Sequence, residues 1–141
     1  MEKKSILRKL FFKRNIQGKG YKAESAACIY LSQRGYTIVE RNFKNQTGYA
    51  LGEIDIVTVK KDSLIFFEVK SGFSGNSSKH LPPELNITQD KLRKLHRIIH
   101  HYRKTHPQYI DMPFSLDALI VEYADSNSDT PHIRHLPNIF L

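Results

Sequence analysis

Two acidic residues and a lysine stand inside apolar segments near the middle of the chain: Asp55 in one segment, and Glu68 and Lys70 in the next. Burying an ionised side chain is costly unless it is paired or binds an ion. Two converging carboxylates attract a hard cation such as Mg²⁺ or Mn²⁺, which takes oxygen ligands from carboxylates, water and phosphate. An ammonium group beside them could hold or deprotonate a water molecule facing a phosphodiester. These residue types therefore indicate metal-assisted phosphodiester hydrolysis, with Asp55 and Glu68 as the metal ligands.

The segments that carry these residues are expected to form a β-hairpin. Residues 53–60 and 63–70 are largely apolar, and Lys61 and Asp62 join them at the spacing of a tight turn. Asp55 lies near the start of the first segment and Glu68 near the end of the second. Antiparallel pairing therefore brings both carboxylates to the same end of the hairpin.

A simpler interpretation is that Glu68 and Lys70 are solvent-facing residues of a one-sided sheet with no chemical role. A Glu-x-Lys pair alone does not exclude it, because such pairs are common in alternating strands. The second acid, Asp55, stands within a hairpin-sized interval of Glu68, and this favours a site.

The flanking segments predict helices and further strands. Apolar residues recur at helical spacing in 21–34 and again after the N-cap candidate Thr88, as far as about residue 106. Strands are expected at 36–42, 114–123 and 133–141, with residues 71–84 as a long loop rich in Gly, Ser and Pro. That loop leaves the proposed catalytic end and could close over a bound strand, or it could be an inert surface loop. Asp117 is expected to be a buried acceptor for a basic neighbour.

The charge of the chain indicates a polyanionic partner. The formal net charge is +8 and the sequence pI is about 9.6, which favours nucleic acid over membrane headgroups. Residues 1–22 carry eight Lys or Arg against one acid, and residues 91–104 carry six with none. Residues 1–17 form a basic arm, which fits a solvated tail, a nucleic-acid arm or a membrane-surface anchor. Residues 18–141 are expected to form one domain.

Several short motifs give the chain a family resemblance. They are GEID at 52–55, FEVK at 67–70, Gly20, Glu24, Ala26, Ala27, Gly35-Tyr36 and Arg41-Asn42. With these motifs, residues 18–123 resemble the YraN-like family of small bacterial proteins, itself similar to the PD-(D/E)xK nucleases and to archaeal Holliday junction resolvases. The resemblance implies an α/β, restriction endonuclease-like fold, a mixed β-sheet flanked by helices.

The resemblance also implies roles for individual residues. Asp55 would be the motif acid, Glu68 and Lys70 the (D/E)xK pair, and Glu24 a helix-borne acid acting through water or a second ion. On spacing alone, Glu24 fits a first-turn acid that compensates the helix dipole. The Val69 carbonyl would join the metal ligands. The family usually has Thr-Arg where this chain has Ser71-Gly72, and Arg-Phe-Asp where it has Ser115-Leu116-Asp117, so two arginines that could contact substrate are missing.

The helix expected after the lysine strand carries the predicted nucleic-acid contacts. These are Gln89, Lys91, Arg93, Lys94 and Arg97. In resolvase-like nucleases, side chains at the start of this helix could reach the metal-bound phosphate. The alternative is a solvated charged face, but no acid in 91–104 is available to neutralise these cations, which favours phosphate.

Three hypotheses of function follow. The first is a Mg²⁺-dependent endonuclease acting on DNA, including branched or junction DNA; a homodimer is expected by analogy, because junction-cutting enzymes need two active sites. The second is a nucleic-acid-binding module that keeps the fold without cutting. The third is a membrane-surface adaptor that uses the basic arm. The single cysteine and the absence of a membrane-length apolar run lead us to expect a cytoplasmic protein without integral membrane association.

Overall fold

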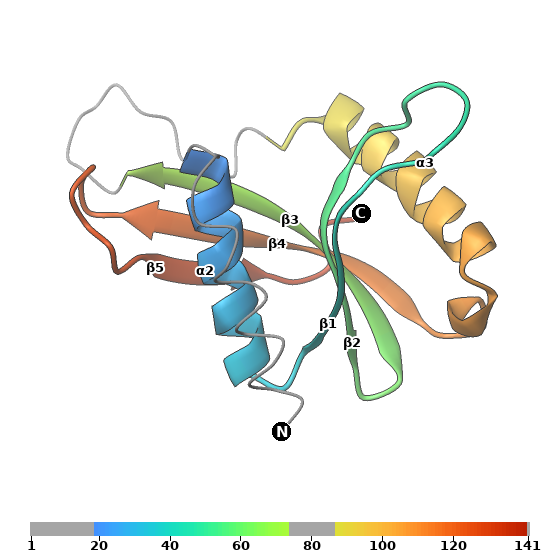
Figure 1. Cartoon of the computed structure of the whole chain (residues 1–141), viewed down its shortest axis with the longest axis horizontal. Coiled ribbons are helices and arrows are strands. Elements are labelled where there is room, and N and C mark those ends of the chain that lie inside the picture. The colour runs from blue at the N-terminus through green and yellow to red at the C-terminus, as the bar shows by residue number, and fades with distance from the viewer. Residues whose placement is uncertain (1–18, 74–86, 141) are drawn as a thin grey trace.

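The computed structural model describes residues 19–73 and 87–140 as one β-sheet with a helix packed on each face (Figure 1). The elements are α2 (Lys19–Gln33), β1 (Thr37–Phe43), β2 (Ile54–Lys60), β3 (Ser63–Phe73), α3 (Gln89–Thr105), the 3₁₀ helix η2 (Pro107–Tyr109), β4 (Phe114–Tyr123) and β5 (His132–Leu136). The predicted α/β class is confirmed, and a mixed sheet flanked by two helices agrees with a restriction endonuclease-like fold. The basic arm at 1–17 and most of the loop predicted at 71–84 lie outside the described residues.

The five strands lie in sequence order, β1-β2-β3-β4-β5. All neighbouring pairs are antiparallel except β3 and β4, which are parallel and joined through α3. A parallel connection requires a crossover, which α3 supplies. Strand β4 therefore lies inside the sheet, as its apolar residues on both faces predicted.

Each face of the sheet has its own hydrophobic core. On one face, Ile65 and Phe67 of β3 pack with Ala27 and Leu31 of α2. On the other face, Leu64 and Phe66 of β3 join a cluster with the buried residues of α3, Leu95, Ile98, Ile99 and Tyr102. Since successive side chains of a strand alternate between faces, this double burial fixes the register of β3.

The central hairpin has the predicted register and turn. Lys61 and Asp62 adopt φ of 45° and 61°, the left-handed conformations of a two-residue hairpin turn. The predicted end of β3 at Lys70 is wrong, because the strand continues through Ser71 and Gly72 to Phe73, paired with β4.

The helix boundaries also follow local signals. Thr88 caps α3, its side chain accepting a hydrogen bond from the Lys91 N–H. Gly35, with φ of 84°, follows the end of α2. The last strand is shorter than predicted and ends at Leu136. Among the described residues, no helix has both the length and the apolar character needed to cross a membrane.

Candidate functional site

Glu68 is a nearly completely buried carboxylate held between two amines. Its side chain is 2% exposed. Its Oε1 atom lies 3.1 Å from Nζ of Lys70, two residues along β3, and 3.4 Å from Nζ of Lys91 in the first turn of α3. Its Oε2 atom is also buried and has no hydrogen-bond partner among the described residues. A buried, unpaired carboxylate oxygen is costly, so this atom is available for a further ligand.

Asp55 lies on the neighbouring strand β2, at the end of the hairpin predicted for it. The register pairs Val57 with Phe66, and two residues further along it places Asp55 across from Glu68. The Val69 N–H donates to Oδ2 of Asp55 at 2.7 Å, which fixes the carboxylate against β3. The prediction that the two acids share one end of the hairpin is confirmed.

The environment of Asp55 disfavours its negative charge. Burial, followed by the nearby charge of Glu68, raises the pKa of Asp55 to about 8, and the charge of Glu24 adds to the rise. The Val69 hydrogen bond and the charge of Lys91 act in the opposite direction but are smaller effects. A carboxyl group whose pKa is raised beside a second carboxylate is well placed to exchange its proton for a metal cation.

An irregularity in β1 and β2 brings both helices near Asp55. Ile54 packs in the α3-side core and Ile56 in the α2-side core, although residues two apart normally share a face. Opposite this break, Asn42 has a left-handed φ of 51°. Asp55 therefore sits where the strand changes faces. This position is consistent with the influence of charges from both α2 (Glu24) and α3 (Lys91) on its pKa.

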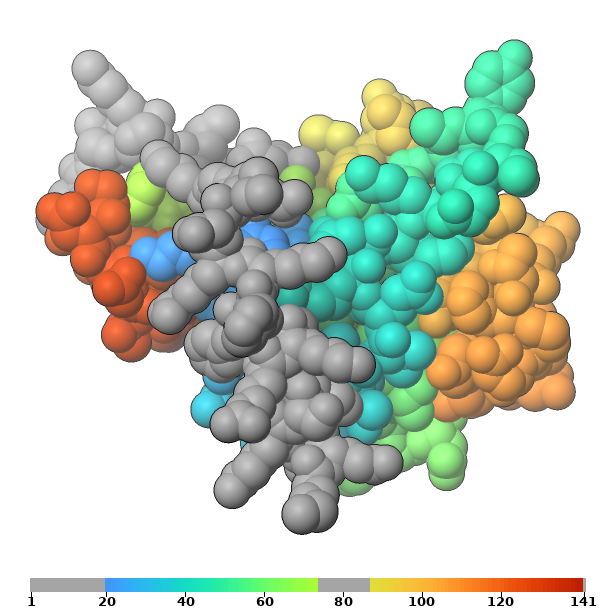
Figure 2. All heavy atoms as spheres, viewed as in Figure 1, coloured from blue at the N-terminus to red at the C-terminus, as the bar shows by residue number. Residues whose placement is uncertain are grey.

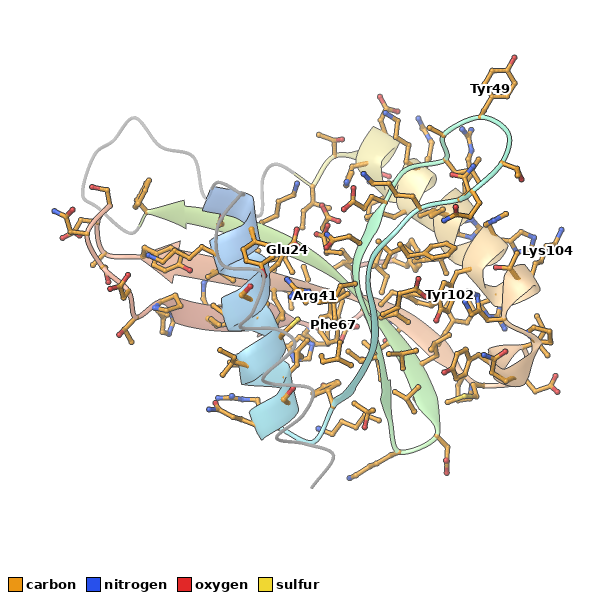
Figure 3. The ribbon with its side chains drawn as sticks, viewed as in Figure 1. Glu24, Arg41, Tyr49, Phe67, Tyr102 and Lys104 are labelled. Atoms are coloured by element: carbon orange, nitrogen blue, oxygen red, sulfur yellow. The ribbon has the colours of Figure 1, made fainter. Side chains whose placement is uncertain are left out.

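Glu24 on α2 is held at the edge of this site. Its Oε2 atom accepts a hydrogen bond from Asn42 Nδ2 at 2.9 Å and lies 3.7 Å from the guanidinium of Arg41. Figure 3 shows Glu24 and Arg41 close together between α2 and β1. Asn42 Nδ2 also donates to Oε1 of Glu53 at 2.9 Å. The Asn42 amide thus joins Glu24 of α2 to Glu53, the residue immediately before β2.

Asn42, Arg41 and Glu53 were not among the predicted site residues. Arg41-Asn42 and the Glu of GEID were noticed only as parts of the family motifs. The role of Asn42 depends on its left-handed backbone, and asparagine is among the few residues other than glycine that adopt it readily. The only local signal in the sequence is an Asn that follows a charged residue at the end of the strand expected at 36–42, and it does not identify a partner 18 residues away.

The predicted nucleic-acid contacts divide into two groups. Lys91 turns to Glu68, and Arg93 pairs with Asp90 at 2.7 Å. The expectation that no acid neutralises these cations is therefore wrong for Lys91 and Arg93. Their partners lie outside residues 91–104: Glu68 is in β3, and Asp90 is in the first turn of α3. Lys94 and Arg97 are exposed and make no hydrogen bond or ion pair with any part of the chain that the structure describes. Gln89 is exposed at the first position of α3.

The donor set fits magnesium better than a metal that prefers several protein ligands. Within residues 19–73 and 87–140, no three His, Cys, Asp or Glu side chains form a ready-made metal cluster. Mg²⁺ is commonly bound by one or two carboxylates, with water and substrate phosphate completing the shell. Asp55, together with the unpartnered Oε2 of Glu68, matches that requirement.

Comparison with known proteins identifies relatives over most of the chain. Residues 23–121 match the Uncharacterised protein family UPF0102. A UPF0102 protein of Sulfurovum sp. (strain NBC37-1) is 42% identical over 102 residues, which are 72% of this chain and 81% of the relative. Similar proteins from Helicobacter hepaticus (strain ATCC 51449 / 3B1) and Helicobacter pylori (strain G27) are each 41% identical, over 77% and 79% of this chain and 87% and 88% of their own lengths.

Proposed function

The chain belongs to the UPF0102 family, and we propose that it is a Mg²⁺-dependent endonuclease that hydrolyses phosphodiester bonds in DNA. The observation that carries the proposal is the pairing of the buried Glu68 with the half-buried Asp55, beside the amine of Lys70. The raised pKa of Asp55 and the Oε2 atom of Glu68, which has no hydrogen-bond partner among the described residues, favour a divalent cation over burial without a ligand.

Asp55 and Glu68 would hold the ion from two adjacent strands, and Mn²⁺ would be accepted at the same site. The hydrogen bond from the Val69 N–H keeps Asp55 oriented before any ligand arrives. A divalent ion here would lower the pKa of a bound water and offset charge on the phosphate. Glu24, held by Asn42 and Arg41, would act through water or a second ion.

The two amines on Glu68 have different proposed roles. Lys70 and Lys91 both approach Oε1 and thereby leave Oε2 for a ligand. Lys70 lies on the same strand as Glu68, so it would orient the attacking water beside the acids. Lys91, in the first turn of α3, would contact the phosphate being cleaved. This assignment gives each of the two amines its own role in the reaction.

The net charge of the chain and the unpaired cations of α3 support DNA as the substrate. The formal charge is +8, and Lys94 and Arg97 project from α3 without a partner among the described side chains. Exposed cations of this kind bind the phosphate backbone without regard to sequence. They would position DNA across the helix that also provides Lys91.

The test is incubation of the purified protein with linear, single-stranded, flap and four-way junction DNA, in Mg²⁺ or Mn²⁺ and in EDTA. We expect metal-dependent cleavage that falls on the order of 10²- to 10³-fold in Lys70→Ala. Lys104→Ala, which removes an exposed lysine at the far end of α3, is the matched control and should cleave normally. If the protein binds DNA but cleaves none of these substrates in either metal, the proposal is wrong and the fold serves a binding module.

A further inference from the structure

The loop between β1 and β2 presents an almost fully exposed aromatic ring. Tyr49 is 94% exposed, whereas the next most exposed large hydrophobic residues in the described part of the chain are only 37% to 44% exposed. Figure 2 shows the turquoise segment of this loop projecting from the body of the molecule, and Figure 3 places Tyr49 at its tip, directed away from the protein. The ring therefore contributes nothing to either hydrophobic core.

The loop that carries Tyr49 is internally braced. Asn45 Nδ2 donates to the carbonyls of Thr47 and Tyr49, each at 2.8 Å, and Asn45 Oδ1 accepts from the Leu51 N–H at 3.0 Å. Gly48, with φ of 79°, provides the left-handed residue of the turn. One side chain thus fixes the backbone on both sides of the tip. A large ring on a braced support loses little conformational freedom when it binds a ligand.

The end of the loop that leads into β2 is connected to functional parts of the molecule. At this end, Gly52 lies against α3, where a Cβ atom would meet Lys94 Cβ at 3.8 Å. At the same end, Glu53 shares the Asn42 amide with Glu24 of the candidate site. The exposed ring, the unpaired cations of α3 and the acids are therefore linked by one short segment of chain.

We propose that Tyr49 stacks on an unpaired base of the DNA substrate while Lys94 and Arg97 hold the adjoining phosphates. Bases within a duplex are already stacked on both faces, so an isolated ring gains most at a base that has lost a neighbour. Stacking depends on the π face common to all four bases and requires no particular sequence. The substrate class would be DNA in which a duplex meets an unpaired segment, as in a flap, gap or branch. This inference rests on the proposed function, because it assumes DNA as the substrate.

The test measures binding of the full-length protein in EDTA, so that cleavage does not contribute. The probes are a fluorescent duplex and a flap DNA of the same sequence. Tyr49→Ala should weaken flap binding about 5- to 150-fold, the range expected for loss of one base–aromatic stack, and leave duplex binding unchanged. Tyr49→Phe, which keeps the ring, should bind as wild type does. Gln46→Ala, an exposed change in the same loop, is the matched control and should have no effect.

A second arm separates stacking from charge. Replacing both Lys94 and Arg97 by Ala should weaken the binding of duplex and flap alike and reduce the dependence on salt, whereas Tyr49→Ala should leave the salt dependence unchanged. A flap DNA that carries 5-iododeoxyuridine at its first unpaired position should photocrosslink to Tyr49. Peptide mapping identifies the crosslinked residue.

Three results would overturn the inference: equal weakening of duplex and flap by Tyr49→Ala, no weakening of either, or a defect in Tyr49→Phe as large as that in Tyr49→Ala. If the wild type binds flap DNA and these results are found, only the role of Tyr49 fails. If the wild type binds neither probe, DNA as the substrate fails as well, and with it the proposed function.

Discussion

Two buried acids on the adjacent strands β3 and β4 differ in how well the protein satisfies them. Asp117 of β4 is 5% exposed and Glu68 of β3 is 2% exposed. Asp117 accepts hydrogen bonds from Ser115 Oγ at 3.0 Å, from the Asn138 N–H at 2.9 Å and, on its other oxygen, at 2.7 Å from Nε2 of His135. Among the described residues, Glu68 has two amines beside its Oε1 atom and no partner for its Oε2 atom.

The pKa shifts at these two places have opposite signs. At Asp117, burial alone would raise the pKa, but the hydrogen bonds from His135, Asn138 and Ser115 outweigh it, and the pKa is lowered. Beside Glu68, burial and carboxylate repulsion raise the pKa of Asp55. A satisfied acid is part of the folded structure, as predicted for Asp117. A buried acid with an unsatisfied oxygen, as at Glu68, instead fits the proposed ligand site.

The largest effect that tests this comparison is on stability. Asp117→Asn removes a charge on which several donors converge and should lower the free energy of unfolding by about 3 kcal/mol. Glu68→Gln removes a poorly satisfied charge and should change it by less than about 1 kcal/mol. Urea unfolding at pH 7 in EDTA measures both. If Glu68→Gln is as destabilising as Asp117→Asn, the contrast is wrong and Glu68 is structural.

A smaller effect concerns pH. Between about pH 4 and about pH 8, Asp55 holds a proton in the folded protein but not in the unfolded chain. Without metal, this group therefore makes the free energy of unfolding fall as pH rises through that range. The decline is at most about 1.4 kcal/mol per pH unit. The pH dependence has the opposite sign for Asp117. Its contribution to the free energy of unfolding is present above the pKa of the unfolded chain and is lost as pH falls through the lower pKa of the folded protein.

The measurement is urea unfolding from about pH 2 to about pH 9 in EDTA. Asp55→Asn should flatten the decline in stability between about pH 4 and about pH 8, whereas Asp117→Asn should flatten the loss of stability below about pH 4. A variant with the slope of wild type would show that its carboxyl group does not titrate as described.

Local signals in the sequence predicted most of the fold. The cap at Thr88 and the pairing of Asp55 with Glu68 follow from rules that involve only nearby residues or one tight turn. The end of β3 was missed because Ser71 and Gly72 favour a turn, and only their pairing with β4, about 50 residues later, keeps them in the strand.

The candidate site was less predictable because part of it is assembled by long-range contacts. The link from Asn42 to Glu24 and Glu53 depends on a single left-handed residue. The capture of Lys91 by Glu68 requires α3 to pack against the sheet, so a residue predicted to bind phosphate is also a partner of the buried acid. The turn and helix rules that predicted the elements do not predict such contacts between them.

The most direct test of the central claim is a calorimetric titration of the protein with Mn²⁺ and Mg²⁺ in the absence of DNA. The account predicts that the wild type binds a divalent ion, that Asp55→Asn and Glu68→Gln each lose most of this binding, and that Asp117→Asn, studied where it is folded, retains it. Equal binding by the wild type and the two site variants, or no binding by the wild type at millimolar metal, would contradict the assignment of Asp55 and Glu68 as a metal site.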